Sequence, residues 1–237
     1  MRITIIGAGR AGTSFARALA NAGQHVQLLS HHDVALIDTP DVVILCVPDD
    51  EIENVARTIT PRADVVLAHV AGSRTLEVLG GHPRVGSLHP LMTLPTGDLG
   101  AKRLIGATFC VSGDALVERI VESLDGRVIR LRDDQRTLYH ATATAASNHL
   151  VALMGQVQRL AEAAGLRLED FLELSRQALD DVALVGPELA LTGPASRGDV
   201  ATIDAHLEAL PDQERSTYVA LAHAAFELAE RRSSHVA

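Results

Sequence analysis

The first half of the chain alternates short apolar runs with helical patterns. Residues 42–47 are continuously apolar, which is typical of a strand buried on both faces of a parallel sheet. The next residues, 48–51, end that strand and begin a helix with acidic side chains at its positive end. Further strands are predicted at 2–6, 25–30, 65–68, 84–88, 108–111 and 126–130, with short helices near 75–79 and 114–124. This alternation predicts an α/β fold with a doubly wound, mostly parallel sheet.

From Asp133 onward the pattern is helical only. A long Ala- and Leu-rich stretch covers residues 133–164 and ends at Gly165, and further helices are predicted at 168–179, 199–210 and 211–232. No strand pattern returns. The sequence therefore predicts two domains, an α/β domain over 1–131 and an all-α domain over 132–237.

The first strand leads into a glycine pattern, G-x-G-x-x-G, that opens a helix. In this position the first glycine permits a tight turn, the second lets the backbone approach a pyrophosphate, and the third lets helix and strand pack closely. The helix N-terminus offers N–H groups and a positive dipole end to phosphates. The pattern predicts a dinucleotide site, and an ordinary glycine-rich turn is the alternative. The residues concerned are Gly7, Ala8, Gly9, Arg10, Ala11 and Gly12.

The end of the second strand bears on the choice of cofactor. An acidic residue there would hold the ribose 2′-hydroxyl of NAD, but the sequence is Ser30-His31-His32, with no acid before Asp33. Arg10 could reach a 2′-phosphate or the adenine face. These features favour NADP, with NAD possible if Asp33 reaches the ribose instead.

Composition narrows the class of protein. The chain has 237 residues, a net charge of −9 and no tryptophan, which argues against a nucleic-acid partner. Cys46 and Cys110 lie in apolar runs and are expected to be buried thiols. No leader pattern or membrane-length apolar run is present, so a soluble cytoplasmic protein without a membrane partner is expected. Histidine spacing suggests no metal site.

Two groups of residues are candidates for chemistry. His89 directly follows a strand, where ligands of open sheets bind, and an imidazole there could give or take a proton; a loop histidine satisfied by backbone is the alternative. The long helix carries an uncharged polar stripe that suits a lined pocket, although a buried network could use the same residues. The stripe comprises His140, Thr144, Ser147 and Asn148, followed by Val151.

A Gly- and Pro-interrupted loop at 191–199 separates two predicted helices. Arg197 in this loop could bind a substrate carboxylate. Asp199 is predicted first as a helix N-cap, with His206 on the same face of the helix that follows.

Taken together, these motifs resemble a bacterial family that joins a Rossmann-like NADP-binding domain to a helical C-terminal domain long labelled as of unknown function. The resemblance covers nearly the whole chain. It rests on the N-terminal glycine pattern, Val47-Pro48-Asp49-Asp50, His89-Pro90-Leu91, Ser147-Asn148 and the 191–199 loop. The helical domain is similar to that of the 6-phosphogluconate dehydrogenase superfamily. The resemblance implies that Val47 and Pro48 contact the cofactor, that the helical domain closes the substrate site, and that it builds a homodimer.

One departure from those enzymes matters. Ketopantoate reductases and β-hydroxyacid dehydrogenases use a lysine on the long helix, whereas the only lysine here is Lys102, in the first domain. His89-Pro90 is similar to the His-Pro pair of prephenate dehydrogenases. The resemblance therefore makes His89 the acid/base candidate, with Ser147 and Asn148 orienting the reacting oxygen or nitrogen.

The sequence thus predicts an NADP-dependent oxidoreductase that transfers a hydride to or from a small oxo, hydroxy or imino acid. A ketopantoate-like 2-oxo acid is a substrate by analogy alone. In this hypothesis His89, Ser147 and Asn148 are catalytic, and His140, Thr144 and Arg197 bind the substrate. The alternative, motivated by the missing lysine, is a dinucleotide-binding sensor or regulatory module without chemistry.

Overall fold

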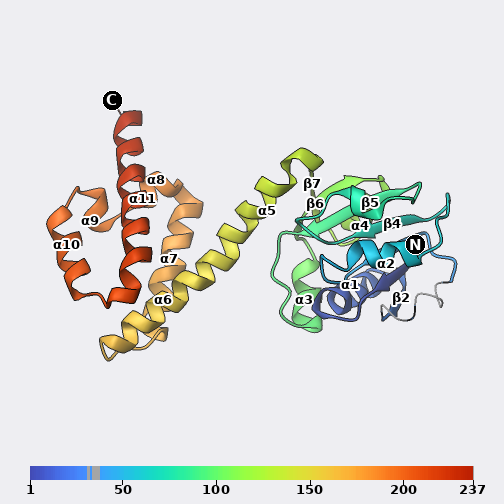
Figure 1. Ribbon diagram of the computed structural model, residues 1–237, viewed down its shortest axis with the longest axis horizontal. Helices are drawn as coiled ribbons and strands as arrows, with labels where there is room; N and C mark the ends of the chain where they lie inside the picture. Colours follow the sequence, from blue (N-terminus) through green and yellow to red (C-terminus); the bar gives the residue numbers. More distant parts are fainter. Residues whose placement is uncertain (31–32, 34–37, 237) are drawn as a thin grey trace. The chain divides into compact units, whose positions relative to one another are not determined.

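The computed structural model describes residues 1–30, 33 and 38–236, which form two compact units (Figure 1). The first unit is Met1–Ser147 and the second is Asn148–Ala237. The sequence placed a domain boundary at 131/132. The structural division falls later because the first part of the long helical segment packs on the sheet.

The first unit is built on a seven-stranded sheet with the order β2-β1-β3-β4-β5-β6-β7. Every neighbouring pair is parallel except β5 and β6, which are antiparallel. The doubly wound, mostly parallel α/β sheet is therefore confirmed. The strands are β1 (Arg2–Ile6), β2 (His25–Leu29), β3 (Val42–Leu45), β4 (Val66–His69), β5 (Val85–Pro90), β6 (Thr108–Gly113) and β7 (Arg127–Arg130).

The strand order reverses between β1 and β3. From β1 the chain adds β2 on one side, and it then returns to add β3 and β4 on the other side. Ile6 pairs with Leu45, and Leu45 with His69, so the carboxyl ends of β1, β3 and β4 lie at one edge of the sheet. In open α/β sheets, ligands bind outside the carboxyl ends of the strands at such a reversal. This edge is where the candidate site is found.

Alternating side chains of the strands fill two separate cores. Ile3 and Ile5 point to the face covered by α1 (Arg10–Asn21), α3 (Gly97–Leu104) and α4 (Leu116–Glu122). Ile6 points to the other face, covered by α2 (Ile52–Thr58) and a 3₁₀ helix, η2 (Leu76–Leu79). Burial on both faces explains the continuous apolar runs of the central strands.

Helix α3 is an element that the apolar pattern did not predict. Its side-chain cap is Thr96, whose hydroxyl accepts from the backbone N–H of Leu99 at 3.4 Å. Its glycines allow close packing on α1: a Cβ at Gly100 would lie 2.0 Å from the hydroxyl of Ser14. Two of its eight residues are glycines, which have a low helix propensity, so the sequence does not predict this helix.

The last helix of the first unit is α5 (Arg136–Thr144), preceded by a 3₁₀ turn, η3 (Asp133–Gln135). A π-helical turn, η4 (Ala145–His149), separates α5 from α6 (Leu150–Ala163). The sequence predicted one long helical stretch over 133–164, and the structure is helical from Asp133 to Ala163. The π turn within it was not predicted, and it shifts the regular α-helical spacing.

The second unit is helical in all its described elements. Beside α6 it contains α7 (Glu169–Val185), α8 (Pro187–Ala190), α9 (Gly193–Ser196), α10 (Val200–Ala209) and α11 (Asp212–Val236). Asp199 caps α10 as expected, accepting from the backbone N–H of Thr202 at 3.1 Å. In the part of the chain that is described, no helix combines the length and apolar character needed to cross a membrane.

Candidate active site

The glycine turn after β1 is shaped by two of its three glycines. Gly7 has φ +109°, a conformation that side chains disfavour, and a Cβ there would lie 2.4 Å from the carbonyl oxygen of Cys46. A Cβ at Gly12 would lie 1.7 Å from the carbonyl oxygen of Gly7. Both positions are therefore closed to side chains by the protein itself.

Gly9 differs from its neighbours because no described atom lies within 4 Å of where its Cβ would stand. It is the N-cap of α1, with ordinary backbone angles and no side-chain cap, and the first turn of the helix contains no acid. Ala8, Gly9 and Arg10 are all exposed. The first N–H groups of a helix have no intrahelical partner, so this end is suited to a phosphate. The turn fits the dinucleotide that the sequence predicted.

The loop after β3 borders the glycine turn directly. Val47 is partly buried, and one of its methyl groups, Cγ1, would lie 3.3 Å from a Cβ at Gly7. Pro48 is exposed, and its carbonyl oxygen accepts from the N–H of Glu51 at 2.9 Å, which turns the chain into α2. Both predicted cofactor contacts thus lie beside the reversal point of the sheet.

At the end of β2, Ser30 is joined to an acid. Its hydroxyl donates to Asp33 Oδ2 at 2.8 Å, and its carbonyl oxygen accepts from the Asp33 N–H at 3.1 Å. The predicted cofactor residues His31 and His32 lie outside the described residues. A carboxylate therefore stands close to the position from which an acid holds the ribose of NAD.

His89 lies in β5 near its carboxyl end, opposite Cys110 of β6. Its Nδ1 lies 2.5 Å from the hydroxyl of Tyr139, and the two rings meet edge to face with centroids 5.6 Å apart. The ring of His140 follows at 6.3 Å. Tyr139 and His140 both come from α5, so this helix supplies one side of the site.

The surroundings of His89 keep its ring neutral. Burial lowers the pKa of His89 to about 4, with a further lowering from His140 and Arg136 and an opposing effect of Asp49. The neighbouring His69, fully buried in β4, has its pKa lowered to about 4 by burial first and by Arg136 second. Both imidazoles are therefore uncharged at neutral pH.

Gly72, in the loop after β4, brings the two histidines of the site together. A Cβ there would lie 2.8 Å from His140 Nδ1 and 2.9 Å from His89 Nε2. The two nitrogens therefore converge on the backbone of Gly72. His140 Nδ1 is buried, and the described residues offer it no hydrogen-bond partner.

Arg136 anchors the start of α5 and was not predicted from the sequence. It is 1% exposed, yet its guanidinium donates to the hydroxyls of Ser87 at 2.8 Å and Ser112, which are themselves 2.9 Å apart. It also reaches the carbonyl oxygen of Ala71 and, at 3.4 Å, the carboxylate of Asp133. Its spacing places it on the helical face of Tyr139 and His140, three and four residues further on, but spacing alone does not indicate that the guanidinium is buried against β5 and β6.

The other predicted site residues belong to both units. Thr144 and Ser147 are partly buried, and the Ser147 hydroxyl donates to its own helix at the carbonyl oxygen of Ala143, 2.8 Å away. Asn148 and Arg197 are exposed residues of the second unit. Their predicted roles at the substrate remain predictions.

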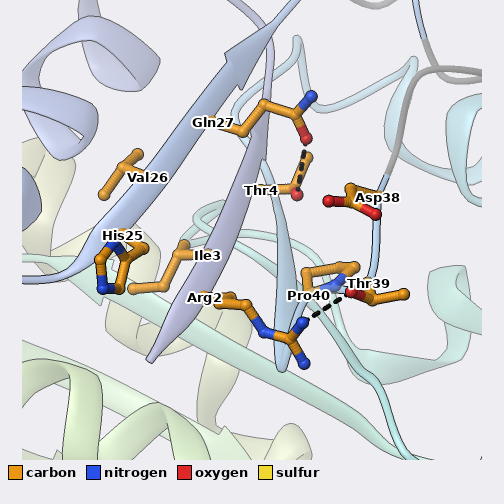
Figure 2. A pocket seen from close by; sticks show the side chains of 9 residues that line it. All are labelled: Arg2, Ile3, Thr4, His25, Val26, Gln27, Asp38, Thr39 and Pro40. Atoms are coloured by element: carbon orange, nitrogen blue, oxygen red, sulfur yellow. Dashed lines mark hydrogen bonds between the residues drawn. The ribbon is translucent and has the colours of Figure 1, made fainter.

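A cavity of about 290 Å³ lies elsewhere, along the first residues of β1 and β2 and residues 38–40 (Figure 2). Arg2 Nη1 donates there to the Thr39 hydroxyl at 2.6 Å, and the Thr4 hydroxyl to Gln27 Oε1 at 3.3 Å. None of the predicted site residues that the structure describes lines it. It is distinct from the glycine turn, which follows the carboxyl end of β1.

Solved structures with the same fold include proteins whose descriptions name NADP or NADPH. A candidate NADP oxidoreductase, BF3122 from Bacteroides fragilis, is 22% identical with a TM-score of 0.79, over 95% of this chain and 98% of that one. TM1727 from Thermotoga maritima is also 22% identical, with a TM-score of 0.78 over 98% and 99% of the chains. A reductive aminase from Aspergillus terreus, in complex with NADPH and ethyl levulinate, is 17% identical with a TM-score of 0.69 over 100% and 99%. These likenesses show the fold.

The comparison with curated proteins finds no match. The family described as Domain of unknown function (DUF2520) matches residues 107–225. The match begins before β6, so it includes Cys110, Ser112, Arg136, Tyr139 and His140 as well as most of the helical unit. The match spans half of the chain, which therefore belongs to the DUF2520 family.

Proposed function

We propose that the protein is an NADP-dependent oxidoreductase that transfers a hydride to or from a small oxo, hydroxy or imino acid. The observation that carries this proposal is the contrast within the glycine turn. Protein atoms require Gly7 and Gly12, whereas Gly9 faces open space at an uncapped helix end. A glycine that the fold does not need is explained by a ligand that approaches its backbone closely.

We expect each part of the cofactor to meet different residues of the site. The N–H groups at the start of α1 would hold the pyrophosphate, and Val47 and Pro48 would border it. Arg10, exposed in the turn, would contact the 2′-phosphate of NADP, while Asp33 would hold the ribose of NAD. When bound, the nicotinamide supplies or accepts the hydride.

His89 is the residue proposed to engage the reacting oxygen or nitrogen of the substrate. It lies at the carboxyl edge of the sheet shared with the glycine turn, it is only partly buried, and Tyr139 fixes its ring. Arg136 helps to lower the pKa values of His69 and His89, while Asp49 acts on both in the opposite direction. The proposed substrate contacts of His140 and Thr144 rest on the polar stripe of the helix, and that of Arg197 rests on its charge and its place in the loop. The orienting roles of Ser147 and Asn148 rest on the resemblance. A ketopantoate-like 2-oxo acid is the substrate suggested by analogy.

Binding and turnover, measured separately, test this function. NADPH and NADH are first titrated against the protein, and turnover is then followed at saturating NADPH across 2-oxo acids and cyclic imino acids. His89→Ala should retain NADPH binding and lose turnover by about a hundredfold or more. His25→Ala, an exposed histidine at the start of β2, is the matched control and should change neither.

The outcomes separate the two functions considered. If an acid is turned over and this turnover depends on His89, the oxidoreductase is supported. Tight NADPH binding with no turnover across the panel would support the sensor instead. No binding of either dinucleotide would remove the basis for both.

We also propose that the second unit forms a homodimer. Among its residues whose exposure is described, only Gln156, Ala161, Ala195 and Glu214 are buried, and two of these are polar. Large apolar side chains are exposed instead, including Leu174 at 65% and Leu184 at 81% on α7. A helical unit with so little buried apolar surface lacks the main driving force for folding, and a second copy of the chain would supply it.

Sedimentation velocity of the full chain tests the dimer. The wild type should sediment as a dimer, and Leu184→Glu should shift the equilibrium toward the monomer and lower the melting temperature. Ile105→Glu changes an apolar side chain of the first unit that is 47% exposed, and it should leave the dimer intact. A wild type that is monomeric at all concentrations would contradict the proposal.

A further inference from the structure

The hydrogen bond between Tyr139 and His89 determines more than the orientation of a ring. A neutral imidazole carries one N–H donor and one acceptor nitrogen, and the partner of one nitrogen decides which role the other takes. Nδ1 of His89 is hydrogen-bonded to the Tyr139 hydroxyl at 2.5 Å. The position of the proton on this bond therefore decides what Nε2 can offer to a ligand.

The phenol has two neighbours that could accept its proton. Burial and the adjacent Cys110 thiol raise the pKa of Tyr139, so its hydroxyl keeps the proton over the working pH range. A thiol sulfur is a weak acceptor, whereas an unprotonated imidazole nitrogen is a strong one. The Tyr139 hydroxyl therefore donates to His89 Nδ1, and the thiol of Cys110 lies behind it.

Charged and titratable groups around His89 act on the same equilibrium. Arg136 and His140 act on it from α5 and Asp49 from the loop after β3. Cys110 lies opposite His89 on β6 and is a neutral thiol, because burial raises its pKa. Arg136 is fixed in place by Ser87 and Ser112, and its cationic charge opposes a second positive charge nearby. Burial is the largest effect and disfavours the imidazolium form, so the neutral ring remains.

We propose that Tyr139 is a positioning residue that holds His89 as the neutral tautomer with its proton on Nε2. In this form His89 donates a hydrogen bond to the carbonyl oxygen or imine nitrogen of the substrate without itself being an imidazolium acid. The inference about the substrate rests on the proposed function. The tautomer itself is a property of the ligand-free protein.

Nitrogen-15 NMR of protein labelled in its histidines reads the tautomer directly. The resonances of His89 are assigned by their loss in His89→Gln. The wild type should show a pyrrole-type shift for Nε2 and a pyridine-type shift for Nδ1, both persisting at pH 6. A pyrrole-type Nδ1 in the wild type would overturn the proposal without any further variant.

Two variants then separate positioning from simple packing. Tyr139→Phe removes the donor but keeps the ring, so the preference for the Nε2 tautomer should weaken and the pKa of His89 should rise. Cys110→Ala removes the thiol next to the same hydroxyl and should leave the tautomer and the pKa of His89 unchanged. Unchanged shifts and pKa in a folded Tyr139→Phe protein would also overturn the proposal.

Kinetics form an independent arm once a substrate is known. Tyr139→Phe should lower kcat by about tenfold or more and leave the KM for NADPH unaltered. If the protein turns over no substrate, the proposed function fails while the NMR result still decides the tautomer. An enzyme whose kcat is unaffected by Tyr139→Phe would show that the hydrogen bond has no role in the reaction.

Discussion

A Cβ on Gly12 would lie 1.7 Å from the carbonyl oxygen of Gly7, so the third glycine of the turn is fixed by contact with the first. Helix α1 and strand β1 meet at this point, and no flexible side-chain end is available to give way. The glycine pattern is therefore a packing device as well as a phosphate site.

Replacing Gly12 should destabilise the first unit. We expect Gly12→Ala to lower the free energy of unfolding by about 3 kcal/mol or more, because the backbone of the turn must move. Urea denaturation followed by circular dichroism measures the change. A variant as stable as the wild type would mean that the turn adjusts at little cost.

Replacing Gly9 should weaken cofactor binding and leave the stability of the fold unchanged. Gly9→Ala meets no described atom and has permitted backbone angles, so stability should be preserved. The added methyl group would stand where a pyrophosphate approaches, and the Kd for NADPH should rise about tenfold or more. Isothermal titration calorimetry measures binding.

The control for Gly9→Ala lies in the second unit. Gly155→Ala adds a methyl group inside α6, where its nearest contact would be 3.6 Å from Arg159 Nη1. It should stabilise the helix by roughly 0.5–1 kcal/mol and leave NADPH binding unchanged. Equal loss of binding in both variants would indicate that the Gly9 effect is indirect.

Arg10 and Asp33 should act in opposite directions on cofactor choice. Arg10→Ala removes a cation near the expected 2′-phosphate, so the Kd for NADPH should rise about tenfold while that for NADH changes little. Asp33→Asn removes a carboxylate that would repel this phosphate, so it should tighten NADPH and weaken NADH. Paired titrations with both cofactors measure the ratio, and parallel changes for the two would refute this division of roles.

Stability should decline as the pH falls from about 6.5 toward 4. The pKa values of His69 and His89 are about 4 in the folded protein, below the ordinary value of 6.5, so the unfolded chain binds more protons in this range. The free energy of unfolding should therefore rise with pH, by at most about 1.4 kcal/mol per pH unit for each histidine.

Urea unfolding at pH 5 and pH 6.5 tests this dependence with little contribution from carboxyl groups. The pKa values of Asp114 and Glu214 are lowered, chiefly by hydrogen bonds from Arg84 and Arg159, so those two groups affect stability mainly at lower pH. His69→Asn should reduce the slope of the free energy of unfolding against pH by the contribution of one histidine. A flat profile between the two pH values would contradict the burial of both neutral rings.

Local patterns predicted most of the fold because each strand has its own signal. The strands of the sheet and the cap at Asp199 follow from apolar runs and capping chemistry, and the glycine turn was predicted in its strand-to-helix context. Helix α3 was missed because it depends on contacts with α1. The π turn was missed because its extra residue leaves no mark in composition.

The site was predicted only in part, for a related reason. His89 could be placed at the end of its strand by sequence alone. Tyr139 and Arg136 could not, because their importance arises from the antiparallel pairing of β5 with β6 and the packing of α5 over it. Such contacts join residues about fifty positions apart, and no local pattern records them.

The burial of Arg136 determines where the chain can be divided. A fragment ending at 131, the boundary expected from the sequence, would lose the guanidinium and leave the hydroxyls of Ser87 and Ser112 facing water beside the apolar core. A fragment ending at Ser147 would keep α5 and its anchor. We therefore expect the sheet domain to fold by itself only when it includes the first helix of what the sequence presents as the helical domain.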